Sequence, residues 1–337
     1  MNVRKIFILI ALMLVTALSL SSVCLAEEWI HKANMPTSRS LFSTSVVNGI
    51  IYAIGGLGNN SNIEAYDPGT NTWTKKTDMP NQRSGQRMGM STSVVNGLIY
   101  VVGGCYSFGS ALPDVDAYDP GTNTWIKKAD MPTPRVFFTT SVVNGIIYAI
   151  GGRMGSPSGS SGATVEAYDP GTNTWTKKAD MPTARDLFSS DVVNGIIYAV
   201  GGDGNSNHAE VEAYNPLTDT WTKKANLSVT RFGMSVNTLN GMIYAIGGWP
   251  SIVEVYDPIS DMWTQKADMP TARGYHSAGV VNGVIYIIGG STDPGSGSPL
   301  SDGIVEAYDP FRAPKRPSLD TDANKLATLW GKVKASD

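Results

Sequence analysis

The chain has 337 residues, of which 26 are basic and 29 acidic, so its formal net charge is −3. Without Arg4 and Lys5, which precede the first apolar stretch, 24 basic residues stand against 29 acidic ones, a net charge of −5. A mildly acidic chain with no run of basic residues is not expected to bind nucleic acid.

The first 26 residues have the pattern of a secretory signal peptide. Two basic residues precede the apolar stretch 6–20, and Cys24-Leu25-Ala26 supplies a small-residue cleavage site. We predict cleavage after Ala26 and export to a periplasm or to the medium. The alternatives are an uncleaved membrane anchor and a lipid-modified Cys24, although Val23 is bulky for a lipid-attachment site. Cleavage leaves Cys105 alone, which excludes an intramolecular disulfide.

One phrase then returns six times. Its Gly-Gly pairs begin at Gly55, Gly103, Gly151, Gly201, Gly247 and Gly289. Its tryptophans are Trp29, Trp73, Trp125, Trp175, Trp221 and Trp263, at steps of 42 to 52 residues. A period in this range, with several short strands per unit, is typical of a propeller blade.

The third copy shows how one blade is expected to form. Two strands, 137–143 and 146–150, are separated by Asn144-Gly145, and Asn-Gly is the strongest two-residue hairpin signal. A third strand is predicted at 165–168 and a fourth from Trp175. Trp29 begins a fourth-strand phrase with no preceding copy, and the last copy ends without one. The N-terminal strand should therefore complete the last of six blades.

The repeat resembles the kelch family over about residues 28–311. The Gly-Gly pair, the tyrosine beyond it and the following tryptophan carry the resemblance, and they occur in six full copies. It implies an all-β, six-bladed propeller of four-stranded blades. We place the signal peptide at 1–26, the propeller at 27–311, and a linker with a short C-terminal segment at 312–337. Residues 322–334 of that segment are a candidate helix.

Variation in spacing is confined to one part of the repeat. The distance from the second glycine of the pair to the acid of the E-x-Y phrase is 8, 12, 14, 10, 6 and 16 residues. The other intervals are constant apart from a four-residue insertion at 81–84. The variable intervals are loops between second and third strands, which emerge on one face of the disc. Because binding usually resides in loops on a rigid scaffold, we expect that face to bind the ligand.

One arginine per copy is expected to begin the innermost strand. The six are Arg39, Arg87, Arg135, Arg185, Arg231 and Arg273. Six guanidinium groups at a channel mouth are suited to binding carboxylates, and the family resemblance implies a ligand role for arginines in this region. Each copy also has an acid as a potential partner, which makes a structural role the favoured alternative for most of them. These acids are Glu64, Asp116, Glu166, Glu212, Glu254 and Glu306.

Departures from the repeat are further candidates. Trp249 and the pair Tyr106 and Phe108 follow Gly-Gly on opposite blades, where aromatic rings stack on a sugar or anchor a peptide, or simply pack within their loops. Asp186 follows a blade arginine, and Asp191 and His276 replace repeat residues of inner strands. With Arg185 they form the most plausible small-molecule site.

Metal and cofactor chemistry finds little support. The stretch 203–207 alternates oxygen ligands, but His208 stands where a calcium loop needs glycine. The three histidines are scattered, and the copper site of galactose oxidase, a kelch-containing enzyme, has no counterpart. We predict no metal and no cofactor.

The function expected first is that of an exported, monomeric binding protein without catalysis, whose partner is a protein segment or a glycan. The rival is a sugar mutarotase that resembles N-acetylneuraminate epimerase, an exported kelch protein. The arginine ring would then hold a carboxylate, and Asp191 or His276 would move the proton. A purely structural surface module is the third possibility.

Overall fold

The computed structural model describes residues 28–58, 62–80, 86–204, 206, 208–293 and 303–312. Residues 29–309 form one compact unit, and residues 1–28 with 310–337 form another, of which Glu28 and residues 310–312 are described. The predicted signal peptide, the insertion at 81–84, Asn205 and Asn207 of the rejected calcium loop, and the predicted C-terminal helix lie outside the described residues.

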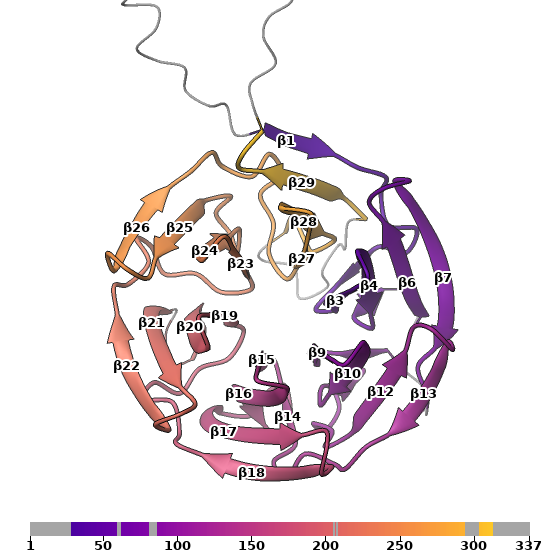
Figure 1. Cartoon of the computed structure of the whole chain (residues 1–337), viewed down its shortest axis with the longest axis vertical. Helices are drawn as coiled ribbons and strands as arrows, with labels where there is room; N and C mark the ends of the chain where they lie inside the picture. The colour runs from indigo at the N-terminus through magenta and orange to yellow at the C-terminus, as the bar shows by residue number, and fades with distance from the viewer. Residues whose placement is uncertain are drawn as a thin grey trace, which may run out of the picture. The chain divides into compact units, whose positions relative to one another are not determined.

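Six four-stranded antiparallel blades form a ring (Figure 1). From the inner to the outer strand, blade 1 contains β3 (Ser43–Val47), β4 (Ile50–Ile54), β6 (Asn62–Asp67) and β7 (Thr72–Asp78). Blade 2 contains β9 (Ser91–Val95), β10 (Leu98–Val102), β12 (Val115–Asp119) and β13 (Thr124–Lys127). Blade 3 contains β15 (Thr139–Val143), β16 (Ile146–Met154), β17 (Ser161–Asp169) and β18 (Thr174–Lys178).

The second half of the ring repeats this order. Blade 4 contains β19 (Ser189–Val193), β20 (Ile196–Gly202), β21 (His208–Asn215) and β22 (Thr220–Lys224). Blade 5 contains β23 (Ser235–Leu239), β24 (Met242–Ile246), β25 (Val253–Asp257) and β26 (Met262–Gln265). Blade 6 contains β27 (Ser277–Val281), β28 (Val284–Ile288), β29 (Val305–Asp309) and β1 (Glu28–His31). The predicted six-bladed propeller is confirmed.

The N-terminal strand closes the ring as predicted. β1 pairs with β29 at the outer edge of blade 6, and the amide of Lys32 donates to the carbonyl of Val305 at 2.9 Å. The ring of Trp29 packs on Tyr308 with 4.9 Å between centroids, as the later tryptophans pack on the tyrosines of their own blades. The last blade is therefore built from both ends of the propeller sequence.

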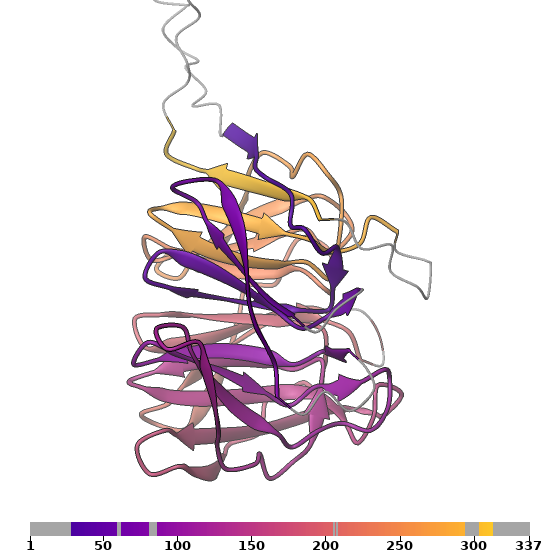
Figure 2. The ribbon, with the colours of Figure 1, turned by 90° about the vertical axis from the view of Figure 1, so that its right-hand side faces the viewer.

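The Asn-Gly pairs adopt the expected hairpin turns. Asn144 and Gly145 have φ angles of 51° and 78°, and both are positive as a type I′ turn requires. In a side view of the ring, tight turns gather at one edge and the longer second-to-third loops at the other (Figure 2). The described parts of the loops of variable length thus share one face.

The apolar core lies between neighbouring blades. Val143 and Ile150 of blade 3, for example, share a buried cluster with Ile197 of blade 4. The indole nitrogen of Trp175 donates to the carbonyl of Ala129 at 3.1 Å, which ties an outer strand to the connection from the preceding blade. Such packing makes each blade a support for the next.

The arginines do not begin the innermost strands, so this detail of the prediction is wrong. Three lie in two-residue ribbons: β2 (Arg39–Ser40) pairs with β5 (Leu57–Gly58), β8 (Arg87–Met88) with β11 (Cys105–Tyr106), and β14 (Arg135–Val136) with β16. Two residues beyond each arginine the chain turns through a positive φ, such as 59° at Phe137, before the inner strand starts. The ribbons place the arginines beside the variable loops.

The described residues include no helix with the length and apolar character needed to cross a membrane.

Candidate functional site

The six arginines are buried structural groups. Each side chain is at most 2% exposed and forms an ion pair with the acid of its own blade. Arg185 is representative: it contacts Glu212 at 2.7 Å and donates to the carbonyl of Gly201, the first glycine of the pair, at 2.9 Å. Burial lowers the pKa of Arg185, and the charge of Glu212 opposes that shift. This geometry favours the structural interpretation over a ligand role.

A closed ring of backbone hydrogen bonds surrounds the channel mouth. Its six members lie two positions after the arginines, and each amide donates to the carbonyl of its counterpart on the preceding blade at 2.7 to 3.1 Å. They are Leu41, Gly89, Phe137, Leu187, Gly233 and Tyr275, all with positive φ. Bulky residues seldom adopt a positive φ, so the closed ring of hydrogen bonds must hold the leucines, Phe137 and Tyr275 in this backbone conformation. The two glycines have a packing reason: a Cβ at Gly89 would meet the ring of Phe137, and one at Gly233 that of Tyr275.

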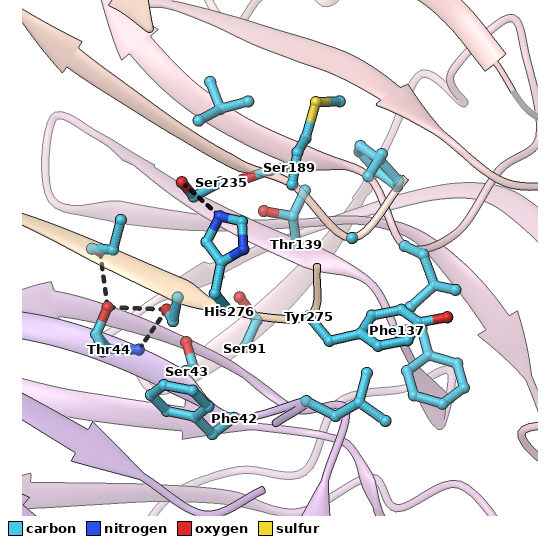
Figure 3. Close-up of a pocket in the computed structure, with 18 of the residues that line it drawn as sticks. Phe42, Ser43, Thr44, Ser91, Phe137, Thr139, Ser189, Ser235, Tyr275 and His276 are labelled. Atoms are coloured by element: carbon cyan, nitrogen blue, oxygen red, sulfur yellow. Dashed lines mark hydrogen bonds between the residues drawn. The ribbon is translucent and has the colours of Figure 1, made fainter. Parts of the chain in front are cut away.

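Within this ring lies a cavity of about 210 Å³. Its lining comes from all six blades, mainly at the positions two to five residues after each arginine, and Figure 3 shows most of these residues as sticks. Serine and threonine supply ten of its 25 residues and most of its polar groups, and the lining includes no Asp, Glu, Lys or Arg. The cavity is smaller than the range of about 300–1,000 Å³ that is usual for drug-sized ligands. It therefore has room for one small group.

His276 is the one titratable imidazole of this lining, where blades 1, 3 and 4 have phenylalanine. Its Nε2 lies 3.3 Å from the hydroxyl of Ser235 (Figure 3) and 3.1 Å from the carbonyl of Ile246. Burial, assisted by the charge of Arg273, lowers the pKa of His276 to about 3. The imidazole is therefore neutral at neutral pH, and its Nε2–H donates to Ile246.

This histidine should make the propeller sensitive to acid. An unfolded histidine titrates near pH 6.5, so stability from the neutral folded imidazole is complete above that pH and is lost as the pH falls toward about 3. We expect His276→Phe to reduce the fall of the unfolding free energy with decreasing pH, which is at most about 1.4 kcal/mol per pH unit. Urea unfolding at pH 7.0, 5.5 and 4.5 measures it. Parallel curves for both proteins would contradict the assignment. The buried Asp186 and Asp191, whose pKa values burial raises, shift stability oppositely but equally in both proteins.

The constellation expected from Asp186, Asp191, Arg185 and His276 is not assembled, because only His276 lines the cavity. Asp191 accepts backbone hydrogen bonds from Val192 at 2.8 Å and Thr238 at 2.5 Å. Asp186 is fully buried. Its Oδ2 accepts a hydrogen bond from the hydroxyl of Ser161 at 2.6 Å and lies 3.0 Å from Nε of Arg153. Asp191 and Oδ2 of Asp186 thus hold loops and blades, whereas Oδ1 of Asp186 is buried without a hydrogen-bond partner among the described residues.

An ionic and aromatic wall borders the mouth on blades 3 to 6. Arg153 bridges Asp186 and Asp203 and lies 5.9 Å from the centroid of Phe137. Trp249 meets Tyr275 edge-on at 4.7 Å between centroids, and Phe232 lies 6.0 Å from each of these two rings. Phe232, Trp249 and Tyr275, here called the aromatic trio, are partly exposed.

The other predicted aromatic residues lie apart from this trio. Tyr106 pairs with Arg87 in the β8–β11 ribbon of blade 2, and Phe108 is 53% exposed. Neither they nor Trp249 line the cavity. Sequence reasoning missed Tyr275, Phe232 and the interblade hydroxyls. A comparison of the residues that follow each blade arginine, copy by copy, contains the signal for all of them.

Among the described residues, no group of three or more His, Cys, Asp or Glu side chains is arranged to hold a metal ion.

Comparisons with known proteins agree with this architecture. The kelch-repeats domain described as KLHDC2/KLHL20/DRC7 matches residues 65–248, and the Kelch motif matches residues 38–80, 230–270 and 272–310. Alpha-scruin of Limulus polyphemus is 29% identical over 105 residues, which cover 30% of this chain and only 11% of that protein. The structure of YjhT is similar in fold, with a TM-score of 0.68 at 18% identity over 80% of this chain and 95% of that one.

Proposed function

This chain belongs to the kelch-repeat family, and on that premise we propose that it is an exported binding protein without catalytic activity. Its ligand, a glycan or a protein segment, binds at the channel mouth on the face of the variable loops.

The observation that carries this proposal is the coincidence of cavity and variable loops. In blades 1 and 2, the ribbons β2–β5 and β8–β11 pair the residues just before the inner strand with the start of the variable loop of the same blade. The cavity lining begins directly after these ribbons. Loops that differ from blade to blade therefore surround a concave site on a rigid scaffold, the usual arrangement for recognition.

The geometry supports binding more than mutarotase chemistry. A mutarotase for an acidic sugar needs a cation for the carboxylate and a group that exchanges a proton. Arg185 is paired with Glu212, Asp191 is held by backbone amides, and the neutral His276 bonds Ile246. No acid–base pair lies in the cavity lining.

A comparison of the protein with two variants, each probed for glycan and peptide binding, tests the proposal. Residues 27–337 are probed against a glycan array and a peptide display library, alongside Trp249→Ala on the mouth and Leu217→Ala on the opposite face. Leu217 is 87% exposed in the turn between β21 and β22, so it is a control of minimal structural cost. We expect Trp249→Ala to weaken binding about tenfold or more and Leu217→Ala to leave it unchanged. Equal binding by all three proteins, or a loss confined to Leu217→Ala, would contradict a site at the mouth.

Export is part of the proposal and rests on the apolar segment 6–20 and the Cys24-Leu25-Ala26 site. A mature chain that begins at Glu27, identified by mass spectrometry of the extracytoplasmic fraction, is the expected result. We also propose that the protein is a monomer, which light scattering checks.

A further inference from the structure

Hydroxyl pairs bridge neighbouring inner strands around the channel. In each pair, the residue four positions after one blade arginine meets the residue five positions after the next. Thr44 and Ser277 bridge blades 6 and 1 at 2.8 Å, and Ser43 and Thr92 bridge blades 1 and 2 at 2.8 Å. The pairs Ser91–Thr140 at 2.9 Å and Thr139–Ser190 at 3.0 Å continue this hydroxyl chain to blade 4. Four of the six junctions are thus bridged.

The hydroxyl chain is broken at the remaining two junctions. Val236 and Ala278 occupy the places of the second hydroxyl on blades 5 and 6. Ser189 consequently makes no side-chain hydrogen bond within the described part of the chain, and Ser235 turns to His276 at 3.3 Å. One layer deeper, Ser45, Ser93 and Ser141 bond the hydroxyl of the next blade, whereas the side-chain oxygen of Asn237 is buried without a partner.

Unused hydrogen-bonding capacity therefore gathers on one side of the cavity. Ser189 and Asn237 both line it, and the aromatic trio belongs to the adjoining blades 5 and 6. A buried polar atom without a partner is uncommon, and Asn237 carries one among the lining residues, while the hydroxyl of Ser189 has no side-chain partner there. A ligand that reaches these groups gains a bond. The opposite side offers less, because each of its hydroxyls already bonds the hydroxyl of a neighbouring blade.

We propose that the break at blades 4 to 6 is the specificity subsite of the mouth, and that it receives an uncharged sugar ring. Ser189 and Asn237 bond ring hydroxyl or acetamido groups, and the aromatic trio stacks on the ring from outside. This inference rests on the proposed function, since it names the ligand class for the same site.

The sugar is uncharged because the cavity has no ion to compensate a charge. The lining lacks charged side chains, and the six blade arginines are already paired with acids. Burial of an unpaired carboxylate is far more costly than burial of a hydroxyl that finds a partner. A hexose should therefore bind, and its uronic acid, which differs in one carboxylate, should be rejected.

The test measures affinities of residues 27–337 for neutral hexoses, N-acetylhexosamines and the matching uronic acids by calorimetry and saturation-transfer NMR. We expect at least one neutral sugar to bind at least tenfold more tightly than its uronic acid. Ser189→Ala should weaken the binding of that sugar about three- to tenfold, as the loss of one hydrogen bond of about 0.5–1.5 kcal/mol implies. The matched control is Ser91→Ala, which lies at the equivalent position of a bridged junction. It should change the affinity for the sugar less than twofold.

A second variant tests the break itself. Val236→Thr with Ala278→Thr restores the repeat residues, so it should abolish sugar binding, and Asn237→Ser provides the same test with less change in volume. The inference is overturned if no neutral sugar binds, if uronic acids bind equally well, or if Ser91→Ala and Ser189→Ala have equal effects. A peptide ligand lost on Trp249→Ala would then still uphold the proposed function, whereas a mouth that binds nothing overturns both.

Discussion

Replacing Arg185 by alanine is expected to lower the free energy of unfolding by about 3–5 kcal/mol. The substitution leaves Glu212, whose side chain is 5% exposed, as a buried carboxylate without its cation. It also removes the hydrogen bond to the carbonyl of Gly201. Chemical denaturation followed by tryptophan fluorescence measures the change.

The control for this prediction is an ion pair at the surface. Lys127 contacts Asp114 at 2.8 Å and Asp130 at 2.7 Å, but its side chain is 46% exposed. Exposed pairs contribute about 0–1 kcal/mol, so Lys127→Ala should be nearly neutral. If Arg185→Ala were equally mild, the blade arginine would not be a structural element and a ligand role would return.

Gly151→Ala is the second substitution from which we expect a large effect, about 2–5 kcal/mol of lost stability. Gly151 has a φ of 61°, and an added Cβ would lie 2.7 Å from Cε1 of Phe188 and 2.8 Å from the carbonyl oxygen of Arg185. The substitution therefore strains the backbone and also drives a methyl group into the neighbouring blade. Denaturant midpoints and thermal melting give the size of the loss.

Gly145→Ala separates these two causes. Gly145 has a φ of 78°, but no atom lies within 4 Å of an added Cβ. Its substitution should cost only the backbone part, about 1–2 kcal/mol. Similar losses for both variants would show that close approach between blades does not explain the Gly-Gly pair.

The architecture was predictable because local chemistry and repetition agree. Asn144-Gly145 specifies a turn through its dihedral preferences alone, and six copies leave little choice of strand order. The lone phrase at Trp29 revealed the closure of the ring, since a fourth strand without its own blade has to pair elsewhere. In each case the signal lies in the sequence neighbours of the residue.

The site was less predictable because its geometry depends on contacts between blades. An arginine beside an acid in every copy is compatible with either a paired or a ligand-binding role, and burial decides between them. Phe137 and Tyr275 look like ordinary strand residues in the sequence. Their positive φ follows from the closed ring of backbone hydrogen bonds, which the sequence does not reveal. The hydroxyl chain emerges when a serine of one blade is aligned with a threonine of the next, a relation that no single copy contains.

Closure by β1 also sets an order of events during folding. The strand at Glu28–His31 pairs with Val305–Asp309, so the earliest-synthesised strand waits for the latest one while the blades between them are made. Pairings of such large sequence separation are slow to form because their loop entropy must be overcome first. Until then blade 6 lacks its outer strand, and the edge of β29 remains available to other chains. The vulnerable period of this propeller is therefore the interval just before its first and last strands meet.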